Sequence, residues 1–196
     1  ISPQSLENEI LGKQIEGLSN HVLPKFDAKK ISKEDENTVN SNRFAAPLMV
    51  NLNLTNSGKW ITLPNGDRVW ILKIKADNAL SLHTLYDHFN LPKGATFHIY
   101  NEEKTIILGA FTTINNKEDG TFATGIIKGD NLIFEYYEPA EMKGQGIISI
   151  NRIDYGYRNT IEKPSFTKNG NAFGTSGACN VNVNCPTGND WDVKFL

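Results

Sequence analysis

The sequence predicts a mainly β protein, an antiparallel β-sandwich with an N-terminal helical or extended arm and an extended C-terminal tail. Between residues 47 and 157, about eight or nine short segments rich in β-branched and aromatic residues alternate with Gly, Asn, Asp and Pro. Asn65 and Gly66 lie between two of these segments, and Asn-Gly accepts the positive φ angles of a tight hairpin turn. Short strands at this spacing favour two packed antiparallel sheets.

Residues 1–23 have the spacing of an amphipathic helix. Their apolar residues recur mostly every three or four positions, at Leu6, Ile10, Leu11, Ile15, Leu18, Val22 and Leu23. Ser2 and Pro3 suit the N-cap and the first helical position, and Pro24 ends the segment. Gly12 and Gly17 each weaken a helix by roughly 1 kcal/mol relative to Ala, so a helix that forms only when docked fits as well as a free one. We expect this arm to serve packing rather than recognition.

Residues 25–46 are polar, charged and poor in aromatic residues, which is typical of a solvated linker. The predicted domains are therefore an arm and linker at 1–46, a sandwich at 47–158, a connector at 159–173 and a short tail at 174–196. The strands expected in the sandwich cover 50–54, 68–75, 80–85, 96–100, 105–111, 122–127, 132–137 and 146–153.

Composition excludes several function classes. The 196 residues include 20 Lys and Arg against 22 Asp and Glu, a net charge of −2. This mixed charge provides no field for nucleic acid or an anionic membrane. No apolar run approaches the roughly 18 residues of a membrane span, so we expect no membrane insertion. A chain that begins at Ile1 without a signal segment is expected to be processed and exported, either secreted or periplasmic.

No catalytic constellation stands out in the sequence. The four histidines lack metal-ligand spacing, and the carboxylates are scattered; the histidines are His21, His83, His88 and His98. The Gly-Thr-Ser-Gly sequence at 174–177 looks like a serine-peptidase nucleophile loop, but no histidine follows Ser176 and none lies within the seventy positions before it. We therefore expect no catalytic residue, no metal ligand and no cofactor in this chain.

Both cysteines, Cys179 and Cys185, lie in the tail. The sequence between them, Asn-Val-Asn-Val-Asn, alternates like a strand, which would separate the two Cα atoms by about 20 Å. A disulfide requires roughly 4.4–6.8 Å between Cα atoms, so an internal bridge needs a turn here. Zinc is disfavoured because the tail supplies no histidine. The favoured interpretation is two half-disulfides whose partners lie outside this chain, with the internal bridge as the alternative.

Seven segments of the chain share one resemblance. They are Val-Asn-Leu-Asn-Leu-Thr-Asn-Ser-Gly-Lys-Trp at 50–60, Leu-Pro-Asn-Gly-Asp-Arg-Val-Trp at 63–70, Leu-Pro-Lys-Gly-Ala at 91–95, Ile-Tyr-Asn at 99–101, Leu-Gly-Ala-Phe at 108–111, Glu-Tyr-Tyr-Glu-Pro at 135–139 and Tyr-Gly-Tyr-Arg at 155–158. This set resembles the pro-region of bacterial lysyl endopeptidase-type, trypsin-like serine peptidases. The segment 174–186, with both cysteines, resembles the start of their mature catalytic domain.

The resemblance implies a propeptide in a peptidase precursor, with 174–196 as the first residues of the peptidase domain. The catalytic triad and the cysteines that pair with Cys179 and Cys185 would lie downstream. The resemblance implies a trypsin-like peptidase domain built from two β-barrels. Such barrels are rich in non-local contacts and fold slowly. The sandwich would therefore assist folding of its cognate peptidase and cover the substrate cleft until proteolytic removal. The chain itself would have no catalytic activity, and its parent would cut after Lys.

The site of proteolytic removal has two candidates. Lysine specificity favours the bond between Lys168 and Asn169, since flexible polar connectors concentrate proteolysis. Alignment of Cys179 and Cys185 with the matching cysteines of the resembled peptidases instead places the mature start at Gly174, after Phe173. Lys163 is handicapped by the Pro164 that follows it.

Two other function classes remain open. One is a stand-alone inhibitor of a separate peptidase. The other is a glycan-binding or adhesive sandwich, for which Trp60, Trp70, Tyr136 and Tyr137 would have to line one exposed face.

Overall fold

The computed structural model describes residues 1–37 and 43–158. The chain divides into two compact units, Ile1–Asn159 and Thr160–Leu196. All described residues belong to the first unit.

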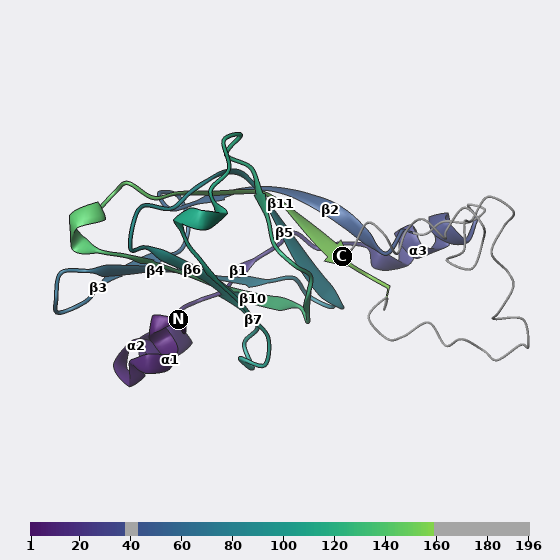
Figure 1. Cartoon of the computed structure of the whole chain (residues 1–196). Helices are drawn as coiled ribbons and strands as arrows, with labels where there is room; N and C mark the ends of the chain where they lie inside the picture. Colours follow the sequence, from purple (N-terminus) through teal and green to yellow (C-terminus); the bar gives the residue numbers. More distant parts are fainter. Residues whose placement is uncertain (38–42, 159–196) are drawn as a thin grey trace, which may run out of the picture. The chain divides into compact units, whose positions relative to one another are not determined.

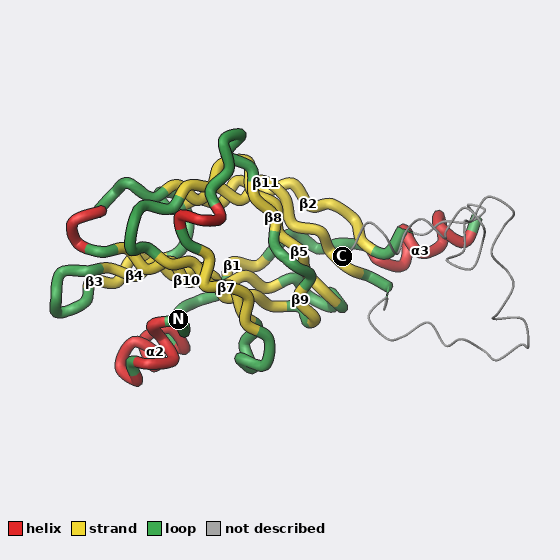
Figure 2. The backbone as a smooth tube through the Cα atoms, in the orientation of Figure 1, coloured by secondary structure: helices red, strands yellow, loops and turns green. Residues whose placement is uncertain are grey.

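Two β-sheets pack face to face, which confirms the predicted sandwich (Figures 1 and 2). Sheet A contains β1 (His21–Val22), β3 (Lys59–Thr62), β4 (Arg68–Lys75), β6 (Thr96–Tyr100), β7 (Ile107–Phe111) and β10 (Asn131–Glu138). Sheet B contains β2 (Ala45–Asn53), β5 (Ser81–Asn90), β8 (Phe122–Ala123), β9 (Ile127–Lys128) and β11 (Ile147–Gly156). The pairings are antiparallel, except that β1 runs parallel to β4.

The main core fills the space between the sheets. Side chains alternate along β4, so Trp70, Leu72 and Ile74 enter this core while Val69 and Ile71 face the other side of sheet A. Aromatic rings dominate the centre: the rings of Phe89 and Phe122 are stacked at 4.1 Å, and Phe89 also makes an edge contact with Tyr86 and a tilted contact with Phe97. Each large apolar side chain buried in this way contributes about 1.5–3 kcal/mol to stability.

The N-terminal arm is helical as far as Glu16 and packs on the outer face of sheet A (Figure 1). The predicted helix does not extend to residue 23, because His21–Val22 pairs with β4 as strand β1. The arm forms two helices, α1 (Gln4–Glu7) and α2 (Glu9–Glu16), rather than one. The break falls at Asn8, whose side chain accepts hydrogen bonds from the N–H groups of Ile10 and Leu11 and so caps α2. Leu11 and Ile15 of α2 then lie against the Val69 and Ile71 face of β4.

A buried carboxylate fixes the arm to sheet A. Glu135 of β10 is 1% exposed, and its Oε2 accepts hydrogen bonds from Ser5 Oγ at 2.5 Å and from Tyr100 OH at 2.9 Å. Its Oε1 accepts from the Ser5 backbone N–H at 3.2 Å, which satisfies a free donor at the start of α1. The arm is therefore positioned by a specific polar contact as well as by apolar packing.

The predicted solvated linker at 25–46 contains a helix, α3 (Ala28–Glu36), so this part of the prediction is wrong. The Asp27 side chain caps α3 by accepting from the Lys30 N–H at 3.0 Å. The buried residue of α3 is Asp35, a charged side chain. Apolar periodicity does not reveal a helix whose buried contact is ionic.

The strand predictions hold in the sheet centres and shift at the ends. β4 and β6 match the predicted 68–75 and 96–100, and Gly66 has φ 90° in the turn between β3 and β4. The predicted strand at 122–127 is two short strands, β8 and β9. Two 3-10 helices, η1 (Thr113–Asn115) and η2 (Ala140–Met142), occupy connecting loops.

Ser5→Ala is expected to lower the free energy of unfolding by about 1–3 kcal/mol, because it removes one donor from a buried carboxylate. Urea denaturation measures the change, and Ser2→Ala, at an exposed position, serves as the control. Equal midpoints for the two variants would show that Glu135 does not hold the arm.

Candidate functional site

The predicted site residues all lie outside the described residues. This applies to Cys179 and Cys185, predicted to form disulfides with outside partners. It applies equally to the processing residues, which are Lys168, Asn169, Phe173 and Gly174. These assignments remain predictions, as does the exclusion of Ser176 as a nucleophile.

Three of the histidines lie apart from one another. His21 is exposed on β1, and His88 is exposed with its Nδ1 3.4 Å from Asp87 Oδ2. His83 Nδ1 lies 3.0 Å from Asp154 Oδ2, a pairing that could orient a catalytic base. Within the described residues His83 makes no hydrogen bond to a serine or cysteine, so the nucleophile of such a site is missing there.

His98 lies beneath the arm, 1% exposed. Its Nε2 is 3.1 Å from the Ile1 carbonyl oxygen, and because a carbonyl only accepts, Nε2 donates. Burial lowers the pKa of His98 from its usual 6.5, against the opposing effects of the Ile1 contact and the Glu135 carboxylate. The side chain is therefore held neutral and helps to fix the first residue of the chain.

Other buried carboxylates also have structural partners. Glu138 accepts from Arg68 Nε at 2.5 Å and from Tyr136 OH at 3.1 Å, while the Gly144 N–H reaches its Oε2 at 3.1 Å. These contacts tie the loop after β10 to the β3–β4 hairpin. Glu138 is therefore engaged in holding loops and has no partner carboxylate in this contact set.

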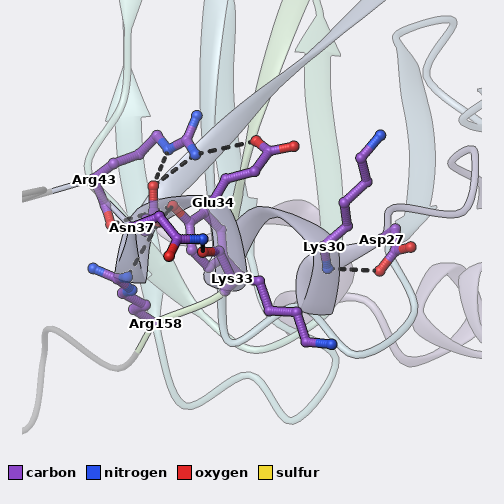
Figure 3. Close-up of polar contacts among 9 residues, drawn as sticks. Asp27, Lys30, Lys33, Glu34, Asn37, Arg43 and Arg158 are labelled. Atoms are coloured by element: carbon purple, nitrogen blue, oxygen red, sulfur yellow. Dashed lines mark hydrogen bonds and ion pairs between the residues drawn. The ribbon is translucent and has the colours of Figure 1, made fainter.

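A cluster of charges around Asp35 joins α3 to one end of sheet B, where the first residue of β2 pairs with the last residue of β11. Figure 3 shows Arg43 and Arg158 beside α3. Arg43 donates to Asp35 Oδ1 through Nε at 2.8 Å and lies within 2.6 Å through its terminal nitrogen. Tyr157 OH donates to Oδ2 at 2.5 Å, and Arg158 approaches the same oxygen at 3.3 Å. We call these four residues the Asp35 cluster; it fixes the chain just before β2 and just after β11.

A cleft of about 610 Å³ opens at the edge of sheet A, and we call it the edge cleft. Two short strands share this edge of β4. The register of β3 ends at the pair Lys59–Ile71, and that of β1 begins at the pair His21–Ile74. Leu72 and Lys73 between them face neither strand, and both line the cleft.

The gap has a local cause at Ser57. Continuing the β3–β4 register would place Ser57 opposite Lys73, but the Ser57 carbonyl accepts the indole N–H of Trp70 at 2.8 Å. The Ser57 N–H is also engaged, donating to the Asn53 carbonyl at 3.2 Å. Gly58 allows this close packing, because a Cβ there would lie 2.5 Å from the Ile71 carbonyl oxygen.

The lining of the edge cleft mixes apolar and polar side chains and includes no acidic residue. Asn20, His21 and Asn56 contribute side chains that hydrogen-bond, and Lys59 and Lys73 contribute the charges. The Lys73 ammonium lies 3.8 Å from Glu102, whereas Lys59 has no ion pair with any described residue. Sequence reasoning missed this site, because the gap depends on where three distant segments end along β4.

The described residues contain no exposed platform built from the four candidate aromatic residues. Trp70 and Tyr136 are fully buried, and the Trp60 ring is covered by the Arg68 guanidinium at 3.9 Å. Tyr137 is half-buried, with its OH donating to Asp67. The condition for the glycan-binding alternative is therefore not met.

The described residues also contain no group of three His, Cys, Asp or Glu side chains placed to hold a metal ion. None of the described helices has both the length and the apolar character needed to cross a membrane.

His98→Gln is expected to reduce the acid sensitivity of the fold. Because the folded-state pKa of His98 is lowered, the unfolded chain binds a proton more readily, and stability falls as pH drops below about 6.5. The substitution is expected to reduce the slope of the free energy of unfolding against pH by at most about 1.4 kcal/mol per pH unit. Urea denaturation between pH 7.5 and 5 measures it, with exposed His88→Gln as control; parallel slopes for wild type and His98→Gln would contradict the assignment.

Asp35→Asn is expected to lower the free energy of unfolding by about 1–3 kcal/mol, since it leaves the Asp35 cluster without its carboxylate. The half-exposed Arg43 keeps the loss below that of a fully buried ion pair. Glu34→Gln is the matched control, because Glu34 approaches Arg43 at only 3.8 Å and is half exposed. Urea denaturation measures both variants. If Glu34→Gln lowers the free energy of unfolding more than Asp35→Asn does, Asp35 is not the central carboxylate of the cluster.

Comparison with known proteins gives little further information. No protein-family model matches the sequence. The crystal structure of Aeromonas hydrophila PliG, a periplasmic lysozyme inhibitor of g-type lysozyme, matches at 12% sequence identity and a TM-score of 0.25. The match covers 60% of this chain and 90% of that chain. A similarity this weak supports no conclusion about this protein.

Proposed function

We propose that this chain is the pro-domain of a secreted or periplasmic trypsin-like serine peptidase of the lysyl endopeptidase type. It assists folding of the peptidase domain and covers the substrate cleft until proteolysis removes it. The observation that carries the proposal is the Asp35 cluster, which fastens the end of the last strand at Arg158. The connector and the cysteine-containing tail of the resemblance follow directly in the sequence.

The position of the cluster supports separation by proteolysis. Lys168 lies ten residues after Arg158, so a cut between Lys168 and Asn169 breaks none of the described contacts. The two sheets, the arm and α3 would remain folded after the cut. A released pro-domain that stays folded can still bind the peptidase, so inhibition would end by dissociation or further digestion.

The polar groups inside the fold support a non-catalytic role. Glu135, Glu138 and His98 are each paired with groups that hold the arm or the loops. General acid and base groups need access to a reacting substrate, and these three side chains are 1% exposed or less. The working surface would then be one that contacts a partner protein.

A stand-alone inhibitor of a separate peptidase is the second candidate. The contacts of Asp35 and Glu135 close the fold within residues 1–158, and such a unit could act without a covalent link to its target.

The full chain is expected to inhibit a mature lysyl endopeptidase and then to be cut in the connector. Hydrolysis of a lysine reporter follows inhibition, while mass spectrometry and N-terminal sequencing follow the fragments. We expect a new terminus at Asn169, its loss in Lys168→Gln, and its retention in the control Lys163→Gln.

A first cut between Phe173 and Gly174 would show that processing begins at the mature start given by the cysteines, and not after Lys168. Inhibition without any cut in 159–173 would favour the stand-alone inhibitor. If the experiment shows no inhibition and no defined cut, both proposals are contradicted.

A further inference from the structure

We infer that the edge cleft is the surface that receives the peptidase, by pairing the free edge of β4 with a short, extended, carboxylate-bearing segment of that partner. The inference rests on the proposed function, because the partner is the peptidase named there.

The backbone at the gap is available for a strand-like contact. The Lys75 carbonyl accepts from the Leu23 N–H on the β1 side of β4. Backbone groups of alternate residues in a strand point the same way, so the N–H of Lys73 also points toward this edge. The β3 register leaves no residue opposite it, and Ser57 is held elsewhere by Trp70. An incoming carbonyl oxygen would satisfy this donor, which is the chemistry of strand addition.

The length of the gap limits the segment. From Ile71 to Ile74 the strand advances about 10 Å, at roughly 3.3 Å per residue. Flanking β3 and β1 occupy the rest of the edge, so only two or three extended residues can pair with β4. The matching element is therefore the tip of a loop or the end of a strand, and the cleft volume of about 610 Å³ accommodates its side chains.

The charge of the cleft selects the side chain. Lys59 is exposed at the rim without an ion pair among the described residues, and no Asp or Glu lines the cleft. Asn20 adds an amide group to the lining. A carboxylate on the incoming segment complements the charge of Lys59, and the extended backbone of the segment complements the Lys73 N–H. A basic segment would be repelled by Lys59.

The first test follows amide hydrogen exchange at Lys73 in the full-length chain. The probe is mature lysyl endopeptidase whose catalytic serine has been covalently blocked, so that the chain stays intact. Exchange at Lys73 is expected to slow by about tenfold or more in the complex, because a new hydrogen bond protects the amide. Unchanged exchange at Lys73 in a complex that does form would overturn the inference.

The second test compares inhibition of the active peptidase by variants with exposed substitutions. Ser19→Trp fills the cleft and Lys59→Glu reverses its charge, and each is expected to weaken inhibition by about tenfold. Ile114→Trp and Lys93→Glu make matched changes at exposed positions outside the cleft and are expected to inhibit like wild type. Thermal unfolding confirms that all four variants are folded.

The outcomes separate the two proposals. Wild-type inhibition that Ser19→Trp and Lys59→Glu leave unchanged overturns the edge cleft but keeps the proposed function. Inhibition lost equally in the control variants also overturns the cleft as the contact surface. Absence of any wild-type inhibition and binding overturns the proposed function together with this inference.

Discussion

The hydrogen bond between the Trp70 indole and the Ser57 carbonyl connects the core of this protein to its candidate working surface. The indole is fully buried between the sheets, and its N–H needs a partner because an unsatisfied buried donor costs about 1–3 kcal/mol. Ser57 supplies that partner and thereby cannot continue the β3–β4 ladder. One requirement of the core thus opens the edge of sheet A at Leu72 and Lys73.

Two buried carboxylates perform a second task, which is to hold the N-terminal region on the sandwich. Glu135 binds Ser5 of the arm, and Asp35 binds Arg43 and Arg158, which lie just before β2 and just after β11 at the same end of sheet B. Buried charges are costly to desolvate, so their partners decide whether they stabilise the fold. Apolar packing of Leu11 and Ile15 adds a non-directional contribution on the outer face of sheet A. The arm and α3 are therefore integral parts of the folded unit.

The sequence predicted the fold where local patterns suffice. Residues 68–75 and 96–100 are rich in strand-forming residues and form β4 and β6, and the Asn65-Gly66 turn joins β3 to β4. It failed for α3, because the buried residue of that helix is Asp35, and two of its partners, Tyr157 and Arg158, lie far away in sequence. The edge cleft was equally invisible, since it depends on the relative ends of β1 and β3. The predicted disulfide and processing residues lie outside the described residues and are carried by resemblance.

Folding assistance distinguishes a pro-domain from a protein that merely binds peptidases. The most direct measurement is the recovery of activity when a denatured lysyl endopeptidase catalytic domain is refolded under oxidising conditions, with and without this chain. Refolding with an equimolar amount of the chain is expected to give a higher rate and yield of active enzyme, with activity measured once the chain has been digested away. Equal recovery with this chain and with an unrelated β-sandwich of similar size would contradict this expectation.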